Sequence, residues 1–229
     1  MIDFSKLAEQ YKHELLEQVI PFWMNHSIDI QFGGFLHCLE RDGSVFDTDK
    51  FVWMQGREVW ILSKLYNTVH EPTVSAETRQ QWLDAAIQGA EFLKSKAHDG
   101  NLNFYFSLDR EGHPLVEPYN IFSYTFAVIA FGQLSLATGN EEYADIARRT
   151  FDIVLAKVDN PKGRWNKAAS GARAMKSFAL PMILCNVALE IEHLLSPDFL
   201  QETMETCIHE VMEVFYRPEL GLIVEHLSM

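Results

Sequence analysis

Two tryptophans, an arginine and a lysine recur at helical spacing in the first third of the chain. If residues 51–64 form a helix, its Trp53, Arg57, Trp60 and Lys64 lie on one face, because side chains three or four positions apart are neighbours on a helix. Indole rings can cover the C–H face of a sugar, and a guanidinium offers rigidly placed donors to oxygen atoms. The stripe therefore predicts a ligand-binding face. The alternative is a half-buried arginine that packs on core tryptophans.

Basic residues form one cluster in this chain, within residues 161–176. Its cations are Lys162, Arg164, Lys167, Arg173 and Lys176, and two glycines lie among them. Glycine and flanking cations ahead of a helix can hold an anion through backbone N–H groups. The spacing is not that of a nucleotide-binding P-loop. The alternative is a solvated basic loop that balances an acidic surface.

The other candidate groups fit structural roles. His37 adjoins Cys38 in a predicted strand, where a half-exposed histidine is ordinary. The acidic residues that could suggest a glycosidase all fall in predicted turns, where acidic side chains are common: Asp47, Asp49, Asp109 and Glu111. The three cysteines lack metal-ligand spacing, so we expect free thiols and no metal site.

Composition narrows the class of protein. The 229 residues include 19 Lys and Arg against 32 Asp and Glu, a formal charge of −13. We therefore expect no binding to nucleic acid or to an anionic membrane, because phosphate contacts need clustered positive charge. The chain begins without a signal-peptide pattern and contains no apolar run of about 18 residues or more. These features predict a cytoplasmic protein.

Apolar periodicity predicts an all-α chain of seven helices. They are expected at 3–26, 50–70, 75–97, 120–138, 140–158, 174–195 and 196–215, with short strands at 33–39, 102–108 and from 222 onward. Asp-Gly and Glu-Gly turns follow the first two strands. Gly139 and Pro72 provide helix stops.

An internal repeat organises these elements. The sequence LERDG at 39–43 recurs as LDREG at 108–112, each copy after an aromatic strand and before an apolar helix. Alternate helices are uniformly apolar, which predicts an inner ring of helices inside an outer ring. The fold expected is an α/α six-hairpin toroid with β-hairpins at one mouth. A complete ring at this period needs roughly 350–400 residues, so we interpret residues 1–229 as a single α/α-barrel domain, incomplete at its C-terminus.

Five motifs in this order resemble the N-acylglucosamine 2-epimerase family, which includes cellobiose 2-epimerases and aldose–ketose isomerases. They are GGF at 33–35, WMQGR at 53–57, EPYNIFS at 117–123, KSFALPM at 176–182 and RPELG at 217–221. The resemblance covers essentially the whole chain. The PM pair at 181–182 is similar to the acylglucosamine branch, because cellobiose-type relatives carry Asn and His in that helix.

The resemblance implies a sugar 2-epimerase that interconverts N-acyl-D-glucosamine and N-acyl-D-mannosamine by deprotonation and reprotonation at C2. Arg57 matches the arginine that holds the substrate oxygen and is the candidate catalytic residue. Candidate substrate-binding residues are Trp53, Trp60, Tyr119, Asn120 and Phe122. The family's two acid–base histidines belong to later helices, and none of the histidines here matches them. The resemblance implies no required cofactor. The resemblance also implies activation by ATP, for which Arg164, Lys167, Arg173 and Lys176 are the candidate residues.

Two alternatives stay open at this stage. An aldose–ketose isomerase would form the same enolate and return the proton to C1, and a non-catalytic form would use the helical surface for binding. The inner helix 120–138 has apolar side chains, including Phe122, Phe126 and Phe131, that seven helices would leave partly uncovered. We therefore expect a homodimer whose small-molecule partner is an amino sugar.

Overall fold

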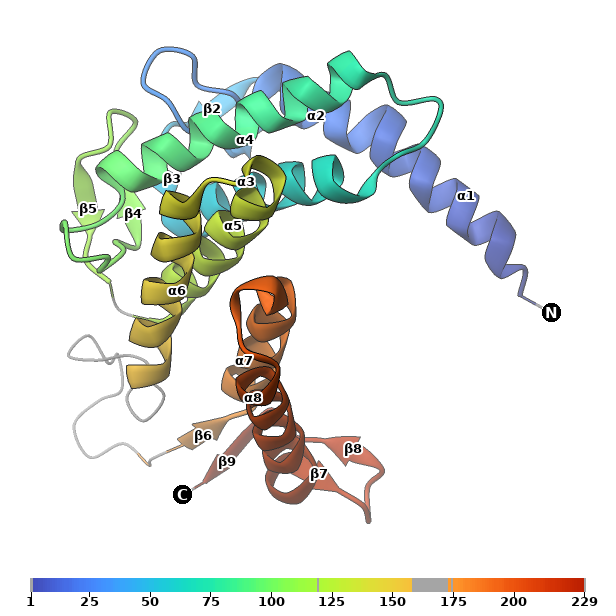
Figure 1. The fold of residues 1–229 in the computed structure, drawn as a ribbon, viewed down its shortest axis with the longest axis vertical. Helices are drawn as coiled ribbons and strands as arrows, with labels where there is room; N and C mark the ends of the chain where they lie inside the picture. The colour runs from blue at the N-terminus through green and yellow to red at the C-terminus, as the bar shows by residue number, and fades with distance from the viewer. Residues whose placement is uncertain (1, 119, 158–172, 174, 229) are drawn as a thin grey trace.

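The computed structural model describes residues 2–118, 120–157, 173 and 175–228. It is mainly helical, and Figure 1 shows the helices arranged as an open arc. Helix α1 extends from one end of the arc. Helices α7 (Ala179–Glu190) and α8 (Pro197–His209), with the short strands of the C-terminal segment, lie at the other end. No helix in the described part of the chain is long and apolar enough to cross a membrane.

The N-terminal helix is long but locally irregular. It consists of α1 (Phe4–Glu14), a π-helical turn η1 (Leu15–Val19) and α2 (Ile20–His26). Asp3 caps its start by accepting a hydrogen bond from the backbone N of Lys6 at 3.1 Å. Pro21 lies in the first turn of α2 directly after η1, so the chain stays helical through a residue that has no N–H to donate. The predicted helix 3–26 is confirmed.

Three helical pairs follow. They are α3 (Val52–Thr68) with α4 (Ala76–Lys96), α5 (Phe122–Thr138) with α6 (Glu141–Ala156), and α7 (Ala179–Glu190) with α8 (Pro197–His209). The first helices of the pairs pack in the order α3, α5, α7, and the second helix of each pair packs on its own first helix. This is the predicted inner and outer layering. A 3-10 turn η3 (Glu192–Leu194) links the last pair, and a π-helical turn η4 (Glu210–Phe215) extends α8.

Helix α5 lies at the centre of the core. Most of its side chains are buried, which agrees with its uniformly apolar sequence. Phe122 and Phe126 are half-buried, as expected for an inner helix of an open arc. The expectation that Phe131 is partly uncovered is wrong. Phe131 is fully buried and its ring lies 5.9 Å from that of Tyr143, because α6 covers this side of α5.

Short strands connect the pairs at one end of the helices. Strand β1 (Cys38–Leu39) pairs with β2 (Val45–Asp47), while β3 (Lys50–Phe51), β4 (Ser107–Leu108) and β5 (Pro114–Val116) form one antiparallel sheet. Both predicted turns are confirmed. The predicted strands 33–39 and 102–108 are too long, because Gly33, Gly34 and Leu102 have φ values of 81°, 67° and 61°, which no strand adopts.

The C-terminal segment contains a pairing that local sequence does not predict. Strand β6 (Met175–Ser177) pairs with β9 (His226–Ser228), and β7 (Tyr216–Arg217) pairs with β8 (Leu222–Ile223). The predicted helix 174–195 is therefore wrong at its start, since residues 175–177 are extended and α7 begins at Ala179. The strand at 222 is confirmed.

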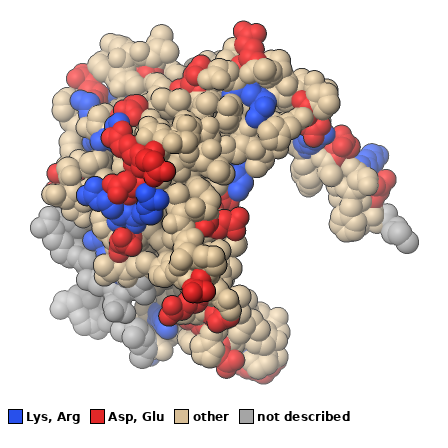
Figure 2. Space-filling model, in the orientation of Figure 1, with Lys and Arg blue, Asp and Glu red and all other residues tan. Residues whose placement is uncertain are grey.

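Acidic and basic side chains are mixed over the outer helices. On the face shown in Figure 2, the basic groups lie beside acidic ones. On α6, Arg148 lies 3.5 Å from Glu141 and Arg149 lies 3.3 Å from Asp145. Exposed ion pairs of this kind contribute little to stability. The buried core therefore provides most of the stability of the fold.

Candidate functional site

The candidate site is centred on α3, whose first turn is fixed by the adjoining strands. The backbone N of Val52 donates to the carbonyl of Phe106 at 3.0 Å, so α3 starts directly from the β3–β4–β5 sheet. Further along, a Cβ atom at Gly56 would lie 2.8 Å from the backbone carbonyl of Phe126. Glycine at this position therefore lets α3 and α5 approach closely, and it brings the next residue, Arg57, to the edge of α5.

Arg57 is exposed and lies over an aromatic ring of α5. Its guanidinium carbon is 5.6 Å from the centre of the Phe126 ring, and the Trp53 ring is 5.8 Å from the same ring. Within the described residues, no carboxylate lies in ion-pair distance of Arg57. Its charge and donors are therefore available to a ligand that stacks near Phe126.

Trp60 and Lys64, one and two turns further along α3, have a common partner on α7. The indole N–H of Trp60 donates to Oε2 of Glu190 at 2.9 Å, and Lys64 Nζ lies 3.0 and 2.9 Å from the two oxygens of Glu190. The predicted stripe thus divides into two parts. Trp53 and Arg57 contact α5, whereas Trp60 and Lys64 are held by α7.

A cavity of about 280 Å³ lies between the N-terminal helix and α3. Side chains of η1, α2 and α3 form its mainly apolar walls, with indoles from Trp23 and Trp60 and polar groups from Arg57 and Glu58. Sequence reasoning missed Trp23 and Glu58. Trp23 belongs to an ordinary apolar helix pattern, and the contact of that helix with α3 is not encoded locally. A carboxylate next to Arg57 was visible in the sequence, but its burial was not.

Glu58 is a carboxyl group without a cation partner among the described residues. Burial raises its pKa to about 8, and the hydrogen bond from the Ser27 hydroxyl acts in the opposite direction. A carboxyl group with this pKa is mostly protonated at neutral pH. The cavity wall therefore combines a permanent cation, Arg57, with a neutral acid, Glu58.

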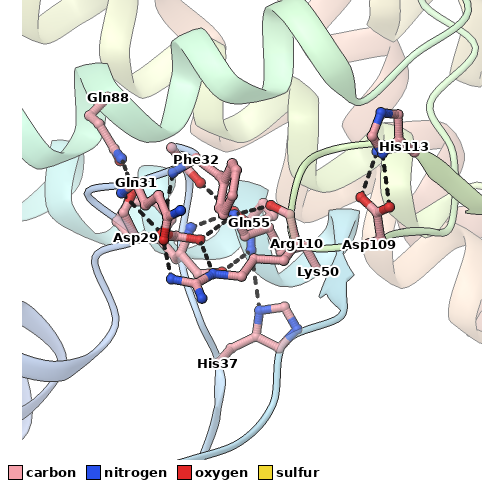
Figure 3. Close-up of polar contacts among 12 residues, drawn as sticks. Asp29, Gln31, Phe32, His37, Lys50, Gln55, Gln88, Asp109, Arg110 and His113 are labelled. Atoms are coloured by element: carbon pink, nitrogen blue, oxygen red, sulfur yellow. Dashed lines mark hydrogen bonds and ion pairs between the residues drawn. The ribbon is translucent and has the colours of Figure 1, made fainter.

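A buried ionic network fixes the strand end of α3 (Figure 3). Asp29 accepts from Lys50 Nζ at 2.9 Å and from Arg110 Nε and Nη2 at 3.0 and 3.1 Å, and Lys50 Nζ also donates to the carbonyls of Gly33 and Arg110. Burial alone would raise the pKa of Asp29, but the bonds from Arg110 and Lys50 lower it to about 2. The network ties the turn that contains Arg110 to the loop after α2 and to Lys50, beside the first residues of α3.

Gln55 and His37 complete this framework. The side chain of Gln55 bonds both backbone groups of Phe35, at 2.8 and 2.7 Å, and its amide nitrogen lies 3.2 Å from His37 Nδ1. The backbone N of Phe51 donates to His37 Nε2 at 3.2 Å. Burial, with the nearby Lys50 charge, lowers the pKa of His37 to about 4. A neutral histidine with its ring bonded to backbone is consistent with the structural role expected for it.

The predicted residues on α5 lie one turn from the Arg57 contact. Asn120 Oδ1 accepts from the backbone N of Phe122 at 2.9 Å, so the Asn120 side chain bonds the first N–H group of α5. Phe122 is half-buried and precedes Phe126 by one helical turn. No described hydrogen bond or ring contact joins Asn120 or Phe122 to Arg57. Tyr119 lies outside the described residues.

The predicted anion site is only partly within the described structure. Arg164 and Lys167 lie outside the described residues, and Arg173 is exposed. Lys176 is on strand β6 rather than at a helix start, and its Nζ lies 2.8 Å from Oε1 of Glu210. Of the two described cations, one is therefore already paired with a carboxylate.

The acidic turn residues act as local caps. Asp47 accepts from the backbone N of Asp49 at 2.9 Å, and Asp109 accepts from the backbone N of His113 at 2.8 Å. The contact of Asp109 agrees with the turn role predicted for it, whereas Asp47 is the last residue of β2 and holds the segment that precedes β3. No cluster of three or more metal-ligating side chains occurs among the described residues.

A family model and individual known proteins identify the same enzyme family as similar to this chain. Residues 34–229 match the family model of N-acylglucosamine 2-epimerase (GlcNAc 2-epimerase). The N-acylglucosamine 2-epimerase of Rattus norvegicus is 36% identical over 218 residues, which are 93% of this chain and 51% of that protein. The human protein of the same name is 36% identical over 179 residues, 77% of this chain and 41% of that protein. The chain spans about half the length of the curated relatives it matches.

Two solved structures share the fold. A sugar epimerase from a ruminal bacterium matches with a TM-score of 0.81 at 20% identity, over 97% of this chain and 59% of that one. The cellobiose 2-epimerase of Bacillus thermoamylovorans matches with a TM-score of 0.82 at 16% identity, over 98% and 60%. The open arc of helices is thus part of an α/α toroid, as the repeat predicted.

Proposed function

This chain belongs to the N-acylglucosamine 2-epimerase family, and we propose that it contributes the sugar-binding part of an enzyme that interconverts N-acyl-D-glucosamine and N-acyl-D-mannosamine. The observation that carries this proposal is the arrangement around Arg57. An exposed guanidinium without a carboxylate partner in the described structure lies over the Phe126 ring and borders a cavity with two indoles. Cationic donors beside flat apolar rings suit a molecule that has oxygens on its edge and C–H groups on its face.

The reaction follows from the chemistry of an open-chain aldose. The hydrogen on C2 is acidic because the electron pair left on its removal delocalises into the C1 carbonyl, which becomes an enolate oxygen. A base removes that proton, and an acid on the opposite face returns a proton to C2, so the configuration inverts. Arg57 is the candidate for holding the enolate oxygen, since its charge does not depend on pH and its donors are fixed in a plane.

The proton-transfer groups are not assigned to this chain. Among the histidines whose rings contact backbone groups, His37 accepts from Phe51 N, His98 accepts from Gly100 N at 3.0 Å, and His193 Nε2 lies 3.2 Å from the carbonyl of Gly132. Burial lowers the pKa of each of them. These rings therefore have structural roles. This supports assigning binding and charge stabilisation, rather than proton transfer, to the described residues.

Three further proposals concern the setting of this activity. Self-association as a homodimer is supported by the exposed apolar residues of α1 and η1. A cytoplasmic location is supported by the three free cysteines.

Activation by ATP through Arg164, Lys167, Arg173 and Lys176 is supported by the family membership and by the basic character of that segment. Isothermal titration with ATP, compared between the parent chain and Arg173→Ala, tests the last proposal.

Solvent exchange tests the proposed reaction. The full-length enzyme that contains this chain is incubated with N-acetylglucosamine or N-acetylmannosamine in D₂O, and the C2 hydrogen is followed by proton NMR. We expect loss of the C2 signal together with formation of the epimer. Deuterium at C1 of a ketose product would identify an aldose–ketose isomerase instead. Absence of exchange with 2-acylamino sugars and simple aldoses, in a folded preparation, would contradict the proposal.

A further inference from the structure

Glu190, the last residue of α7, is in contact with two residues of α3. Its side chain is only 12% exposed, one oxygen accepts the indole N–H of Trp60 at 2.9 Å, and both oxygens lie within 3.0 Å of Lys64 Nζ. Because α5 lies between α3 and α7 in the inner layer, this contact joins two helices that are not neighbours. A half-buried carboxylate with a charged partner and an indole donor is a well-satisfied group.

The backbone of Glu190 is fixed independently of its side chain. Gln133 on α5 donates from Nε2 to the Glu190 carbonyl at 2.7 Å. A Cβ atom at Gly132 would lie 2.5 Å from Cγ2 of Ile191, so the end of α7 packs directly on the backbone of α5. The backbone position of Glu190 is therefore set by α5, independently of Trp60 and Lys64.

Trp60 has its N–H edge at Glu190 and also lines the cavity beside Arg57. An indole has a single donor, so one hydrogen bond at a fixed acceptor selects one orientation of the ring. Lys64 has a different role, because it balances the carboxylate charge and does not line the cavity. Loss of Glu190 would free the ring of Trp60, whereas loss of Lys64 would leave the N–H bond in place.

We propose that Glu190 is a positioning residue that fixes the indole of Trp60 in the cavity wall beside Arg57, and so sets the surface on which the sugar stacks. This inference rests on the proposed function, because it assigns a sugar to the cavity. Glu190 acts through Trp60 and does not itself contact the sugar. The ligand class is a neutral sugar with an apolar C–H face and oxygens that Arg57 can reach.

The indole signals of the protein, labelled with nitrogen-15, test the positioning directly. The chain has five tryptophans, and comparison with Trp60→Phe identifies the signal of Trp60. In Glu190→Ala we expect this signal to shift and its hydrogen to exchange with solvent about five- to tenfold faster, the equivalent of one lost hydrogen bond. Lys64→Met should keep the signal in place. Glu190→Gln should restore it in part, because the amide oxygen can still accept the N–H.

Sugar binding is measured on the same variants by tryptophan fluorescence during titration with N-acetylmannosamine. We expect Glu190→Ala to weaken binding about five- to tenfold and Glu190→Gln to weaken it less. Thermal unfolding of each variant shows whether it is folded, and the milder Glu190→Gln provides a test if Glu190→Ala does not fold.

The outcomes distinguish failure of the Glu190 inference from failure of the proposed function. An unchanged Trp60 signal in a folded Glu190→Ala variant overturns the inference, as does an equal change in Lys64→Met. A moved Trp60 signal with unchanged sugar affinity also overturns it, because the position of the ring would then have no effect on the ligand. If the parent chain binds no sugar, the proposed function fails, while the indole signals still decide whether Glu190 positions Trp60.

Discussion

Lys50 Nζ lies 2.9 Å from Oδ2 of Asp29, and neither side chain has any exposed surface. The pair is surrounded by further bonds, since Arg110 also donates to Asp29 and two carbonyls accept from Lys50. It joins a loop after α2 to the strand before α3, so it fixes where α3 begins. The stability of the loop and strands at the start of α3 should therefore depend on the Lys50–Asp29 pair.

We predict that Asp29→Asn lowers the free energy of unfolding by about 3–5 kcal/mol, because it leaves the buried Lys50 cation without a counter-charge. Lys50→Met should cost less, since Asp29 keeps Arg110 as a partner. Denaturation in urea measures both. Asp145→Asn on α6 is the matched control, because Asp145 forms an exposed pair with Arg149. A loss in Asp29→Asn no larger than in that control would contradict the prediction.

Gly56 is expected to be intolerant of any side chain. A Cβ atom there would lie 2.8 Å from the carbonyl of Phe126, so Gly56→Ala must push α3 and α5 apart. We expect a net loss of about 1–3 kcal/mol despite the better helix propensity of alanine. Urea denaturation checks the value, and Gln81→Ala on the exposed face of α4 is the control. Equal or greater stability of Gly56→Ala would show that α3 and α5 can accommodate a methyl group between them, and would contradict the prediction.

Arg57→Lys tests whether the planar shape of the guanidinium matters in addition to its charge. Lysine keeps the charge and loses the fork of donors, so we expect the rate of C2 exchange by the full-length enzyme to fall about 10²-fold. Stability should hardly change, because Arg57 is exposed. Arg149→Lys, also exposed, should keep the full rate. If Arg57→Lys retains most of the activity, Arg57 acts only as a point charge or lies outside the site.

Glu58 predicts a specific dependence of stability on pH. Burial raises its pKa in the folded protein to about 8 from 4.5, so between these values the folded state holds a proton that the unfolded state lacks. The stabilisation is full below about pH 4.5 and is lost as the pH rises through about 8.

The matched variant is Glu58→Gln, which cannot titrate. Relative to it, the parent chain should lose on the order of 2–4 kcal/mol of unfolding free energy between about pH 5 and about pH 9. Urea denaturation across this range gives the difference, and Glu219→Gln, at an exposed turn position, keeps Glu58 and should follow the parent profile. Parallel profiles for the parent chain and Glu58→Gln would mean that Glu58 titrates normally.

The sequence was most informative where structure depends on neighbouring residues. Helical periodicity and caps predicted α3 to α6 closely, because the apolar face and the end signals of a helix lie within its own segment. The start of α7 was predicted wrongly, since the extended form of Met175–Ser177 depends on pairing with His226–Ser228. The inner and outer layering was predictable because the repeat LERDG and LDREG fixed the order of the units.

The candidate site was predictable only in part. Trp53, Arg57 and Trp60 stood out because their spacing places them on one helix face. The partners that define their roles come from other helices: Phe126 from α5 and Glu190 from α7. The raised pKa of Glu58 likewise depends on how the N-terminal helix packs on α3. No local sequence pattern contains these contacts. The roles of Trp53, Arg57 and Trp60 could therefore be assigned only from the folded structure.

The apolar surface of η1 predicts self-association. Val19 is 45% exposed and lines the cavity beside α3, and α1 continues this surface with exposed Phe4 and Tyr11. Apolar surface of this kind favours association. We expect the chain to form dimers in sedimentation velocity, and Val19→Asp to shift the population towards monomer because it places a charge in the contact. Ile30→Asp is the matched control, since Ile30 is 94% exposed and does not line the cavity. A parent chain that stays monomeric at high concentration, or equal effects of the two substitutions, would contradict the assignment of this surface.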